Sequence, residues 1–292
     1  MVAPESTLVY HQATIREHRD QPDKMIEPEH TGEVLQTADN SVNVLIGTLI
    51  HRQGAYIIDK FLANQEEIQS AYPSSKLIIA TSETDYSAEL NNLLNCRKLR
   101  SCVINYQVIK PNHAQSRIWN IASGREALRN YMLGLNQAQY LLFLDSDMTF
   151  DPSVISIMER EIQGYDAVFS GYYFRNYGLG FAGAGCLMLT RTILPKIEFR
   201  CYEFKNGEVI FEDNIVEMDI FQSGGRIKKG IFVAAEHYTA ADEFQRAVPR
   251  PMSIGQRITN HPLLRYFLIK ASIMVRYNIP WHIKVFFSKW SA

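Results

Sequence analysis

Short apolar runs alternate with longer amphipathic segments from residue 42 onward, and this alternation limits the chain to few folds. The pattern is typical of β-α-β units, in which helices flank a mainly parallel sheet. The helix at 123–135 is expected to be opened by Ser123, a capping-type residue. The predicted strands and helices are strands 42–47, 76–80, 103–108 and 140–144, and helices 55–70 and 123–135. The predicted fold class is therefore α/β, Rossmann-like, with a mainly parallel central sheet.

Composition divides the chain into three parts. Residues 1–40 contain one aromatic residue, with eight acidic and three basic side chains, and bury too little apolar surface to offset the entropy of ordering. We expect a flexible or loosely docked extension there. Residues 41–243 carry the α/β pattern and form the predicted catalytic domain. Residues 244–292 contain eight basic and no acidic residues and form a basic, aromatic C-terminal segment that we expect to be helical.

Several classes of protein lack their signature motifs in this sequence. The four cysteines show no CxxC pairing, which favours reduced thiols in the cytoplasm over zinc sites or disulfides. The N-terminus has no signal-peptide pattern, and no window of about 18 residues is apolar enough to span a membrane. No G-x-S-x-G, G-x-x-x-x-G-K-[ST], H-E-x-x-H or G-x-G-x-x-G motif occurs. Covalent hydrolase chemistry and ATP hydrolysis therefore have no visible apparatus.

The strongest chemical signal is Asp145-Ser146-Asp147, which directly follows the apolar run YLLFL at 140–144. Open α/β sheets bind ligands at the carboxyl ends of their strands, so two carboxylates are delivered where a ligand is expected. The outer aspartates can bind one hard divalent cation, and such a cation can bridge the phosphates of a nucleotide. The sequence therefore predicts a metal-assisted nucleotide site at this strand end.

Ordered blocks extend this signal to a family resemblance. VLIGTLIHRQGAYIIDKFLANQ, ALRNYMLGLNQAQYLLFLDSDMTFDPSVI, GAGCLML and FEDNIVEMDIFQSGG follow one another over roughly residues 42–240. Their order and spacing resemble a family 2-type glycosyltransferase with the GT-A fold. The resemblance implies transfer of a sugar from a nucleoside-diphosphate sugar to an acceptor hydroxyl. We expect inversion by direct displacement, although retaining enzymes share the same fold and site.

The resemblance also implies a set of donor-binding residues. The acidic residue that many relatives carry after the second strand is displaced here, so Glu83 or Asp85 is expected to replace it, and the base stays open. Arg129 lies sixteen residues before Asp145, and Arg125 lies one turn earlier on the same helical face. The predicted nucleotide-sugar ligands are Gly47, Thr48, Arg52, Glu83, Asp85, Arg125, Arg129, Asp145 and Ser146.

The implied catalytic machinery consists of a metal site and a general base. Mn²⁺ or Mg²⁺ is expected on Asp145 and Asp147, with His237 as a third ligand after the strand-like IFVAAEHY. Asp213 is the expected base, and Glu212 is expected to position the acceptor. The alternating glycines Gly178, Gly180, Gly183 and Gly185 are interpreted either as a sugar-side or acceptor-side loop or as a plain turn cluster.

Residues 262–292 interleave aromatic and basic side chains and suggest a peripheral membrane contact. The enzyme would then work in the cytoplasm at the inner face of the membrane, on a glycan or lipid-linked acceptor. Packing of this segment on the catalytic domain, or on a second copy of the chain, explains the same residues equally well. We expect no nucleic-acid partner.

Two other functions fit parts of the sequence. A sugar-nucleotidyltransferase also carries metal-binding aspartates on an α/β sheet, but it normally has a Gly-rich basic loop near its start, which is absent here. A non-catalytic carbohydrate-binding module would keep the fold without turnover, and loss of the metal-binding aspartates would favour it. Both aspartates are present.

Overall fold

The computed structural model describes residues 42–135, 138–174, 178–180, 183–204, 207–239, 244–247 and 252–277. The chain divides into two units, Met1–Asp39 and Asn40–Ala292, and all described residues lie in the second. The predicted extension at 1–40 is therefore outside the described residues. The predicted boundary at residue 243 stays a prediction.

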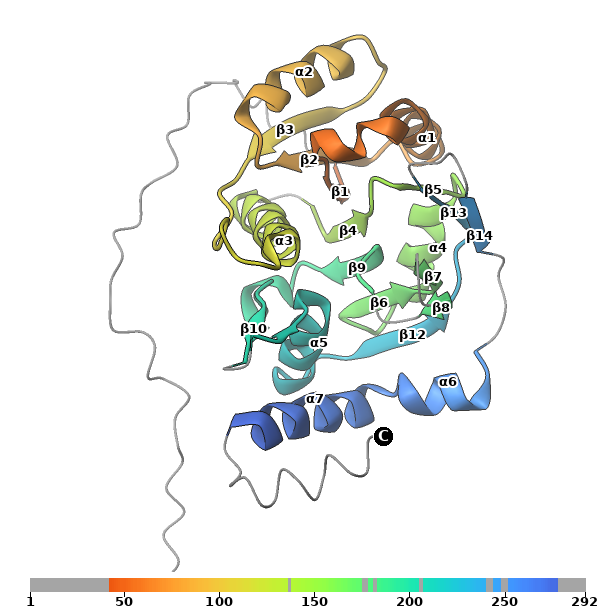
Figure 1. Cartoon of the computed structure of the whole chain (residues 1–292). Coiled ribbons are helices and arrows are strands. Elements are labelled where there is room, and N and C mark those ends of the chain that lie inside the picture. Colours follow the sequence, from red (N-terminus) through yellow and green to blue (C-terminus); the bar gives the residue numbers. More distant parts are fainter. Residues whose placement is uncertain are drawn as a thin grey trace, which may run out of the picture. The chain divides into compact units, whose positions relative to one another are not determined.

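A seven-stranded sheet forms the centre of this unit, in the order β12-β6-β9-β4-β1-β2-β3 (Figure 1). Every neighbouring pair is parallel except the two that involve β9, which is antiparallel to both β4 and β6. The predicted α/β class with a mainly parallel sheet is confirmed. The strands are β1 (Val44–Leu49), β2 (Ser75–Thr81), β3 (Ser101–Asn105), β4 (Tyr140–Leu144), β6 (Ala167–Ser170), β9 (Cys186–Thr190) and β12 (Ile227–Ile231).

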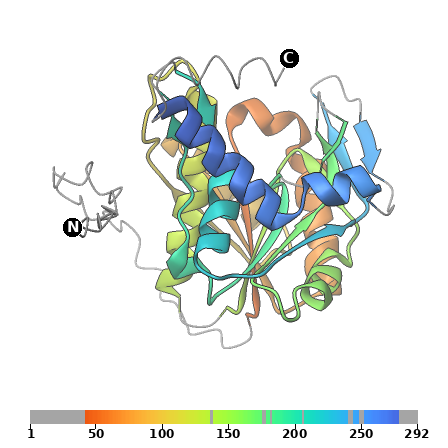
Figure 2. The same ribbon diagram turned by 90° about the horizontal axis from the view of Figure 1, so that it is seen from below.

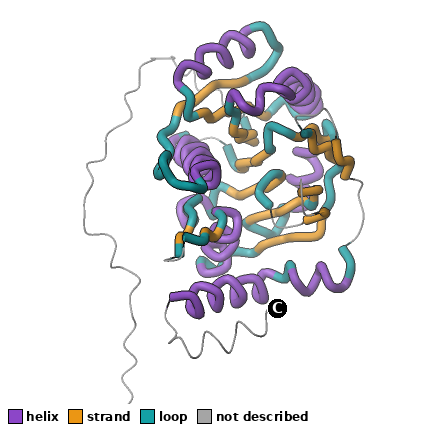
Figure 3. Tube along the Cα trace, viewed as in Figure 1, coloured by secondary structure: helices purple, strands orange, loops and turns teal. Residues whose placement is uncertain are grey.

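Helices cover both faces of the sheet, as the distribution of purple helices around orange strands shows in Figure 3. Side chains alternate between the two faces of a strand. Along β1, Val44 and Ile46 therefore enter the core beneath α1, α2 and α4, while Leu45 enters the core beneath α3 and α5. The helices are α1 (Ile58–Ala71), α2 (Thr84–Asn95), α3 (Ser116–Gly134), α4 (Val154–Glu161) and α5 (Glu212–Gln222), with 3₁₀ turns η1 (Arg52–Ile57) and η2 (Leu194–Lys196).

Small antiparallel sheets complete the unit. The most important for the site has the order β14-β13-β5, because it places β13 beside the residues that follow β4. The remaining strands are β5 (Met148–Phe150), β7 (Tyr172–Phe174), β8 (Gly178–Gly180), β10 (Tyr202–Glu203), β11 (Val209–Ile210), β13 (Ala235–Tyr238) and β14 (Phe244–Ala247).

The structure corrects three details of the sequence prediction. Helix α3 begins at Ser116, and Ser123 lies inside it, where its hydroxyl donates to the Trp119 carbonyl oxygen and accepts from the Ile109 amide. Ser123 is therefore not a cap. The segment 84–95, which carried no helix prediction, forms α2. The strand-like run before His237 is divided between β12 and β13.

The described part of the C-terminal segment contains strand β14 and two helices, α6 (Ile254–Thr259) and α7 (Pro262–Tyr277), so the predicted helical character is confirmed for 254–259 and 262–277. Helix α7 lies across α5, as the view from below shows (Figure 2). Tyr266 of α7 stacks on Phe221 of α5 with ring centroids 4.7 Å apart, and Ile269 is buried. Among the described residues, no helix has both the length and the apolar character needed to span a bilayer.

Candidate active site

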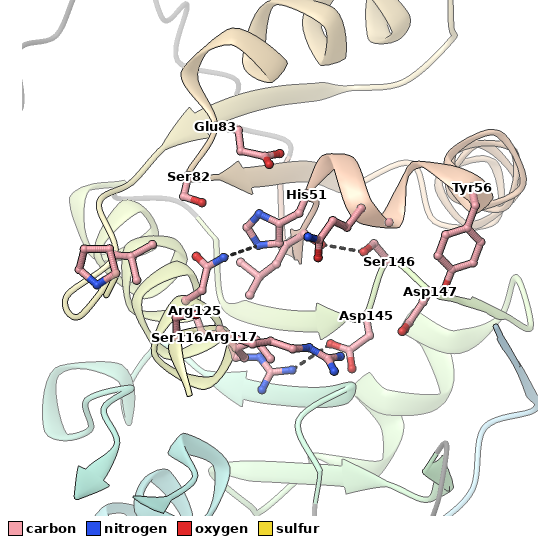
Figure 4. Close-up of a pocket in the computed structure, with 17 residues that line it drawn as sticks. His51, Tyr56, Ser82, Glu83, Ser116, Arg117, Arg125, Asp145, Ser146 and Asp147 are labelled. Carbon is pink, nitrogen blue, oxygen red and sulfur yellow. Dashed lines mark hydrogen bonds and ion pairs between the residues drawn. The ribbon is translucent and has the colours of Figure 1, made fainter. Parts of the chain in front are cut away.

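A cavity of about 620 Å³ opens where three parallel strands end (Figure 4). Leu49 ends β1, Ser82 follows β2 and Asp145 follows β4, and all three line the cavity. Open α/β sheets bind ligands in this position. The lining residues are Leu49, His51, Gln53, Gly54, Tyr56, Ser82, Glu83, Val108, Pro111, Ser116, Arg117, Asn120, Ile121, Arg125, Asp145, Ser146 and Asp147.

One wall of the cavity contains a hydrogen-bonded group of three side chains. The Tyr106 hydroxyl donates to Asn120 Oδ1 at 2.7 Å, and Asn120 Nδ2 lies 3.2 Å from His51 Nε2. An amide nitrogen only donates, so His51 Nε2 accepts and the ring proton lies on Nδ1. Burial lowers the pKa of His51, which keeps the ring neutral at pH 7. His51 therefore brings one fixed N–H donor to the cavity wall.

Among the described lining residues, Glu83 is the one acidic side chain on the same side of the cavity, beside Ser82. It immediately precedes α2, and its Oε2 accepts the Arg52 backbone amide at 2.7 Å. The Arg52 guanidinium lies outside the lining and pairs with Asp85 at 3.2 Å and Glu89 at 2.8 Å. Of the predicted residues Arg52, Glu83 and Asp85, the structure therefore places only Glu83 in the cavity.

Gly47 and Thr48 lie inside β1 and do not line the cavity. A Cβ at position 47 would lie 3.2 Å from Leu128 Cδ1, so the glycine lets α3 pack closely on the sheet. Thr48 is buried. Leu49 at the end of β1 and His51 in the loop after it meet the cavity instead.

Arg125 forms ion pairs with one residue of each acidic pair that the sequence analysis identified, Asp145 and Glu212. Its Nη2 donates to Asp145 Oδ1 at 2.9 Å, and its Nη1 donates to Glu212 Oε1. The side chain is 7% exposed and that of Glu212 is 6% exposed. Burial opposes the charge of the guanidinium, but Asp145 and Glu212 outweigh it and raise the pKa of Arg125. The arginine is therefore a permanent buried cation between β4 and α5.

Arg129 does not reach the cavity, although it shares a helical face with Arg125. Its guanidinium pairs with Glu126, donates to the Leu194 carbonyl oxygen at 2.9 Å and contacts Asn130. These contacts fix η2 against α3. The structure therefore assigns a packing contact to Arg129 and places Arg125 at the site.

The three residues after β4 point in different directions. The Ser146 hydroxyl donates to the Leu49 carbonyl oxygen at 2.7 Å and so fastens the ends of β1 and β4 together. Asp147 Oδ2 lies 3.3 Å from His237 Nε2, because β13 pairs with β5 and brings the histidine alongside. The structure thus brings together two of the three predicted metal ligands, from segments 90 residues apart in sequence.

Asp145 does not complete a three-residue metal cluster. Within the described part of the chain, no three His, Cys, Asp or Glu side chains gather in a way that could hold a metal ion. Asp145 Oδ1 is engaged by Arg125, whereas Asp147 and His237 lie together. Asp145 as a metal ligand stays a prediction.

Gly185, which directly precedes β9, lies against Asp145. The Asp145 amide donates to the Gly185 carbonyl oxygen at 3.0 Å, and the Gly185 amide donates to Tyr172 Oη at 3.1 Å. A Cβ at position 185 would lie 2.5 Å from Asp145 Oδ2 and 2.7 Å from Tyr172 Cζ. A side chain at this position would therefore displace Asp145 or Tyr172 from its hydrogen bonds. Gly178 and Gly180 belong to β8, so the glycine-rich run does not form one loop.

Glu212 and Asp213 begin α5, where the helix dipole favours carboxylates. Glu212 is committed to Arg125, whereas Asp213 is partly exposed and accepts two bonds at Oδ1, from the Asn214 amide at 2.7 Å and from Asn214 Nδ2 at 2.8 Å. Partial burial, together with the neighbouring Glu212 carboxylate, raises the pKa of Asp213 to about 7. An acid with this pKa can exchange a proton near neutral pH.

Sequence reasoning missed several lining residues, among them His51, Tyr56, Ser82, Arg117 and Asn120. Arg117 and Asn120 were missed because α3 was predicted to begin seven residues too late. The Arg117 side chain is exposed at the cavity, and its guanidinium makes no hydrogen bond or ion pair with any other described residue. The available signal was a cation in the first turn of the helix that leads to the aspartates.

No protein-family model and no curated protein matches the sequence. Among solved structures, the chain is similar to A197 from STIV, with 15% identity and a TM-score of 0.39 over 73% of this chain and 98% of that chain. It is similar to S. aureus TarS 1-349 in complex with UDP, with 12% identity and a TM-score of 0.44 over 64% of this chain and 57% of that chain.

A third similar structure is the mannosyltransferase PcManGT from Pyrobaculum calidifontis in complex with GDP-Man and Mn²⁺. Its identity is 11% and its TM-score 0.44, over 63% of this chain and 53% of that chain. The match therefore spans little more than half the length of TarS 1-349 and of PcManGT. All three TM-scores are below 0.5, so the function has to be inferred from the site itself.

We predict that Gly185→Ala destabilises the protein by about 1–3 kcal/mol, because the new methyl group overpacks the space between Asp145 and Tyr172. Gly134→Ala is the matched control, since a Cβ there meets no atom within 4 Å and its effect should stay within about 0.5 kcal/mol. Urea unfolding measures both. Equal stability of the two variants would contradict the close approach at Gly185.

Proposed function

We propose that this chain is a glycosyltransferase of the GT-A type, which transfers a sugar from a nucleoside-diphosphate sugar to an acceptor hydroxyl. The observation that carries the proposal is a single cavity that joins two chemically different regions. One region contains neutral donors and one carboxylate, at His51, Ser82 and Glu83, and the other contains Asp145, Asp147 and two arginines. A nucleotide has the same polarity, with a hydrogen-bonding base at one end and phosphates at the other.

The base and the diphosphate would bind at opposite ends of this cavity. The fixed N–H of His51 and the Glu83 carboxylate offer one donor and one acceptor to a base edge. Arg117 and Arg125 offer guanidinium groups, which suit phosphate oxygens. This division supports a nucleoside diphosphate as the substrate, and we propose that its attached sugar is directed toward α5.

The donor set fits a divalent cation that is held partly by the substrate. Mg²⁺ is commonly bound by one or two carboxylates together with substrate phosphates, and imidazole suits Mn²⁺-type metals. Asp147 and His237 would hold the ion, with Asp145 Oδ2 as a further oxygen, because Oδ1 is engaged by Arg125. When bound, Mn²⁺ or Mg²⁺ would neutralise charge on the departing diphosphate.

Asp213 is the proposed general base. Its Oδ1 is occupied by Asn214, and its Oδ2 has no hydrogen-bond partner among the described residues. The acceptor oxygen forms a bond to the anomeric carbon while its proton passes to Asp213. The bond from the anomeric carbon to the diphosphate oxygen breaks, and its electron pair leaves with the diphosphate. Glu212 acts by holding Arg125 rather than by contacting the acceptor.

We predict that nucleoside diphosphates with Mn²⁺ raise the stability of the wild-type protein by about 2.7 kcal/mol at 100 times the dissociation constant. Asp147→Ala should lose this metal-dependent gain and keep the fold. Asp59→Ala, at an exposed aspartate in α1, should behave as wild type. Thermal shift with UDP, GDP and their sugars measures the gain, and an unchanged gain in Asp147→Ala would overturn the metal assignment.

Turnover should depend on Asp213 and on pH. A base acts when deprotonated, and the pKa of Asp213 is raised to about 7, so transfer should increase as pH rises through about 7 and then level off. Asp213→Asn should lower turnover by about 10² or more, remove this limb and leave donor affinity nearly unchanged. Detection of an acceptor linked to the sugar would show transfer, whereas detection of pyrophosphate would indicate a nucleotidyltransferase. Binding of the donor without turnover would indicate a non-catalytic module.

We also propose that α6 and α7 contact an anionic lipid surface. Of the nine large hydrophobic residues that are exposed in the described part of the chain, six lie on these helices, including Ile254 at 77% and Phe267 at 56% exposure. On α7 they occupy the stripe of Leu263, Leu264, Phe267 and Leu268, away from the face that meets α5. Residues 244–292 carry no acidic side chain, which matches a negatively charged surface.

A double variant, Phe267→Ser with Leu268→Ser, should reduce co-sedimentation with phosphatidylglycerol vesicles at least tenfold. Burial of each such side chain contributes about 1.5–3 kcal/mol, and about 1.4 kcal/mol corresponds to a factor of ten. Ile109→Ser is the control, because Ile109 is 60% exposed but lies outside α6 and α7. Wild-type protein that stays in the supernatant with these vesicles would refute the lipid contact and favour an oligomer contact.

A further inference from the structure

The face of α7 that meets α5 carries a single arginine with two partners. Arg265 Nε donates to Glu217 Oε2 at 2.7 Å, and Arg265 Nη2 donates to Asn214 Oδ1 at 2.5 Å. Both partners lie on α5, one turn apart. The Arg265 side chain is 19% exposed and that of Glu217 is 2% exposed, so these bonds are shielded from water.

Glu217 binds a second cation besides Arg265. Its Oε1 lies 2.7 Å from Lys229 Nζ on β12, and the Lys229 side chain is 3% exposed. Glu217 therefore forms ion pairs with cations on two elements, β12 and α7. Because a buried carboxylate with two fixed partners cannot rotate freely, the position of the Arg265 head is set by the sheet as well as by α7.

Arg265 in turn fixes the orientation of the Asn214 amide. A primary amide has one accepting oxygen and one donating nitrogen on opposite sides. Once Oδ1 accepts from Arg265, Nδ2 points toward Asp213, and it donates to Asp213 Oδ1 at 2.8 Å. The same Oδ1 also accepts the Asn214 backbone amide at 2.7 Å. These contacts hold the Asp213 carboxylate in one rotation, with Oδ2 left for the acceptor.

We infer that Arg265 is a positioning residue for catalysis, which orients Asp213 through Asn214 and makes docking of α7 on α5 a requirement for turnover. This inference rests on the proposed role of Asp213 as base. The C-terminal segment then contributes to the reaction as well as to the outer surface. Misplacement of a reacting group by about 1 Å can cost about 10² in rate, so loss of this contact should be visible in turnover.

Several charged or titratable groups act on Asp213, and they come from every element packed around it. Glu212 raises its pKa, whereas Arg125 and Arg265 lower it. Among the described residues these groups are Glu212 on α5, Arg125 on α3, Tyr172 on β7, Cys201 before β10, Lys229 on β12 and Arg265 on α7. Removal of Arg265 withdraws one of the three cations in this set, so the pKa of Asp213 should rise.

The test compares Arg265→Met with Arg200→Met in the full-length protein. Arg200 is a matched control, because it pairs with Asp219 on the same helix at 2.5 Å and 3.0 Å but has no contact with Asn214. Arg265→Met should lower kcat about tenfold or more, leave the Kd for the nucleoside diphosphate within about twofold, and move the acid limb of the pH profile upward. Arg265→Lys should restore little, because an ammonium lacks the two-pronged geometry.

The same substitution in an Asp213→Asn background separates positioning from general damage. If Arg265 acts through Asp213, Arg265→Met should add no further loss there. An equal loss in both backgrounds, or an equal loss in Arg200→Met, would overturn the inference. If Asp213→Asn itself keeps wild-type turnover, the assignment of the base fails instead.

A carboxyl ¹³C NMR titration of Asp213 gives a readout that needs no turnover. The signal is assigned by its absence in Asp213→Asn. The midpoint should rise in Arg265→Met and stay unchanged in Arg200→Met. An unchanged midpoint in Arg265→Met would overturn the inference even if no sugar donor were turned over, whereas a raised midpoint without any transfer would place the failure in the proposed function.

Discussion

The site depends on one buried cation. Arg125 cannot be removed from water unless carboxylates compensate its charge, and loss of one partner of a buried pair typically costs about 3–5 kcal/mol. Its two partners, Asp145 and Glu212, come from β4 and α5, while the arginine belongs to α3. The ion pairs therefore require these three elements to meet at one point. Because Asp145 faces the cavity and Glu212 is followed by Asp213, the same requirement sets the spacing between the cavity and the proposed general base.

The two acidic pairs, Asp145 with Asp147 and Glu212 with Asp213, share one arrangement. In each pair the first carboxylate, Asp145 or Glu212, forms an ion pair with Arg125. The second carboxylate of each pair has other surroundings: Asp147 lies beside His237, and the pKa of Asp213 is raised by burial and by Glu212. Arg125 therefore leaves Asp145 Oδ2 as the oxygen of Asp145 that the proposed metal site uses, and it explains the role of Glu212 beside the proposed base.

Local pattern predicted the strands well and the starts of helices poorly. Strands β1, β2 and β4 were expected because their residues alternate between two cores or form fully apolar runs. Helix α3 begins seven residues earlier than Ser123 indicated, since a serine inside a helix can satisfy its hydroxyl on the preceding turn. That error hid Arg117 and Asn120. Helix α2 was missed because the segment after β2 was interpreted as a loop that carried a base-binding acid.

The sequence by itself determined the alternation of strands and helices, the delivery of Asp145 and Asp147 at the end of a buried strand, and the basic character of the C-terminal segment. These features depend on backbone periodicity and composition, which are local. Only the tertiary structure decided that Arg125 rather than Arg129 reaches the site, that His237 meets Asp147, and that Arg265 meets Asn214. Each of these choices is a contact between segments distant in sequence. Packing and the cost of burying charge select such contacts, and neither quantity exists until the chain has folded.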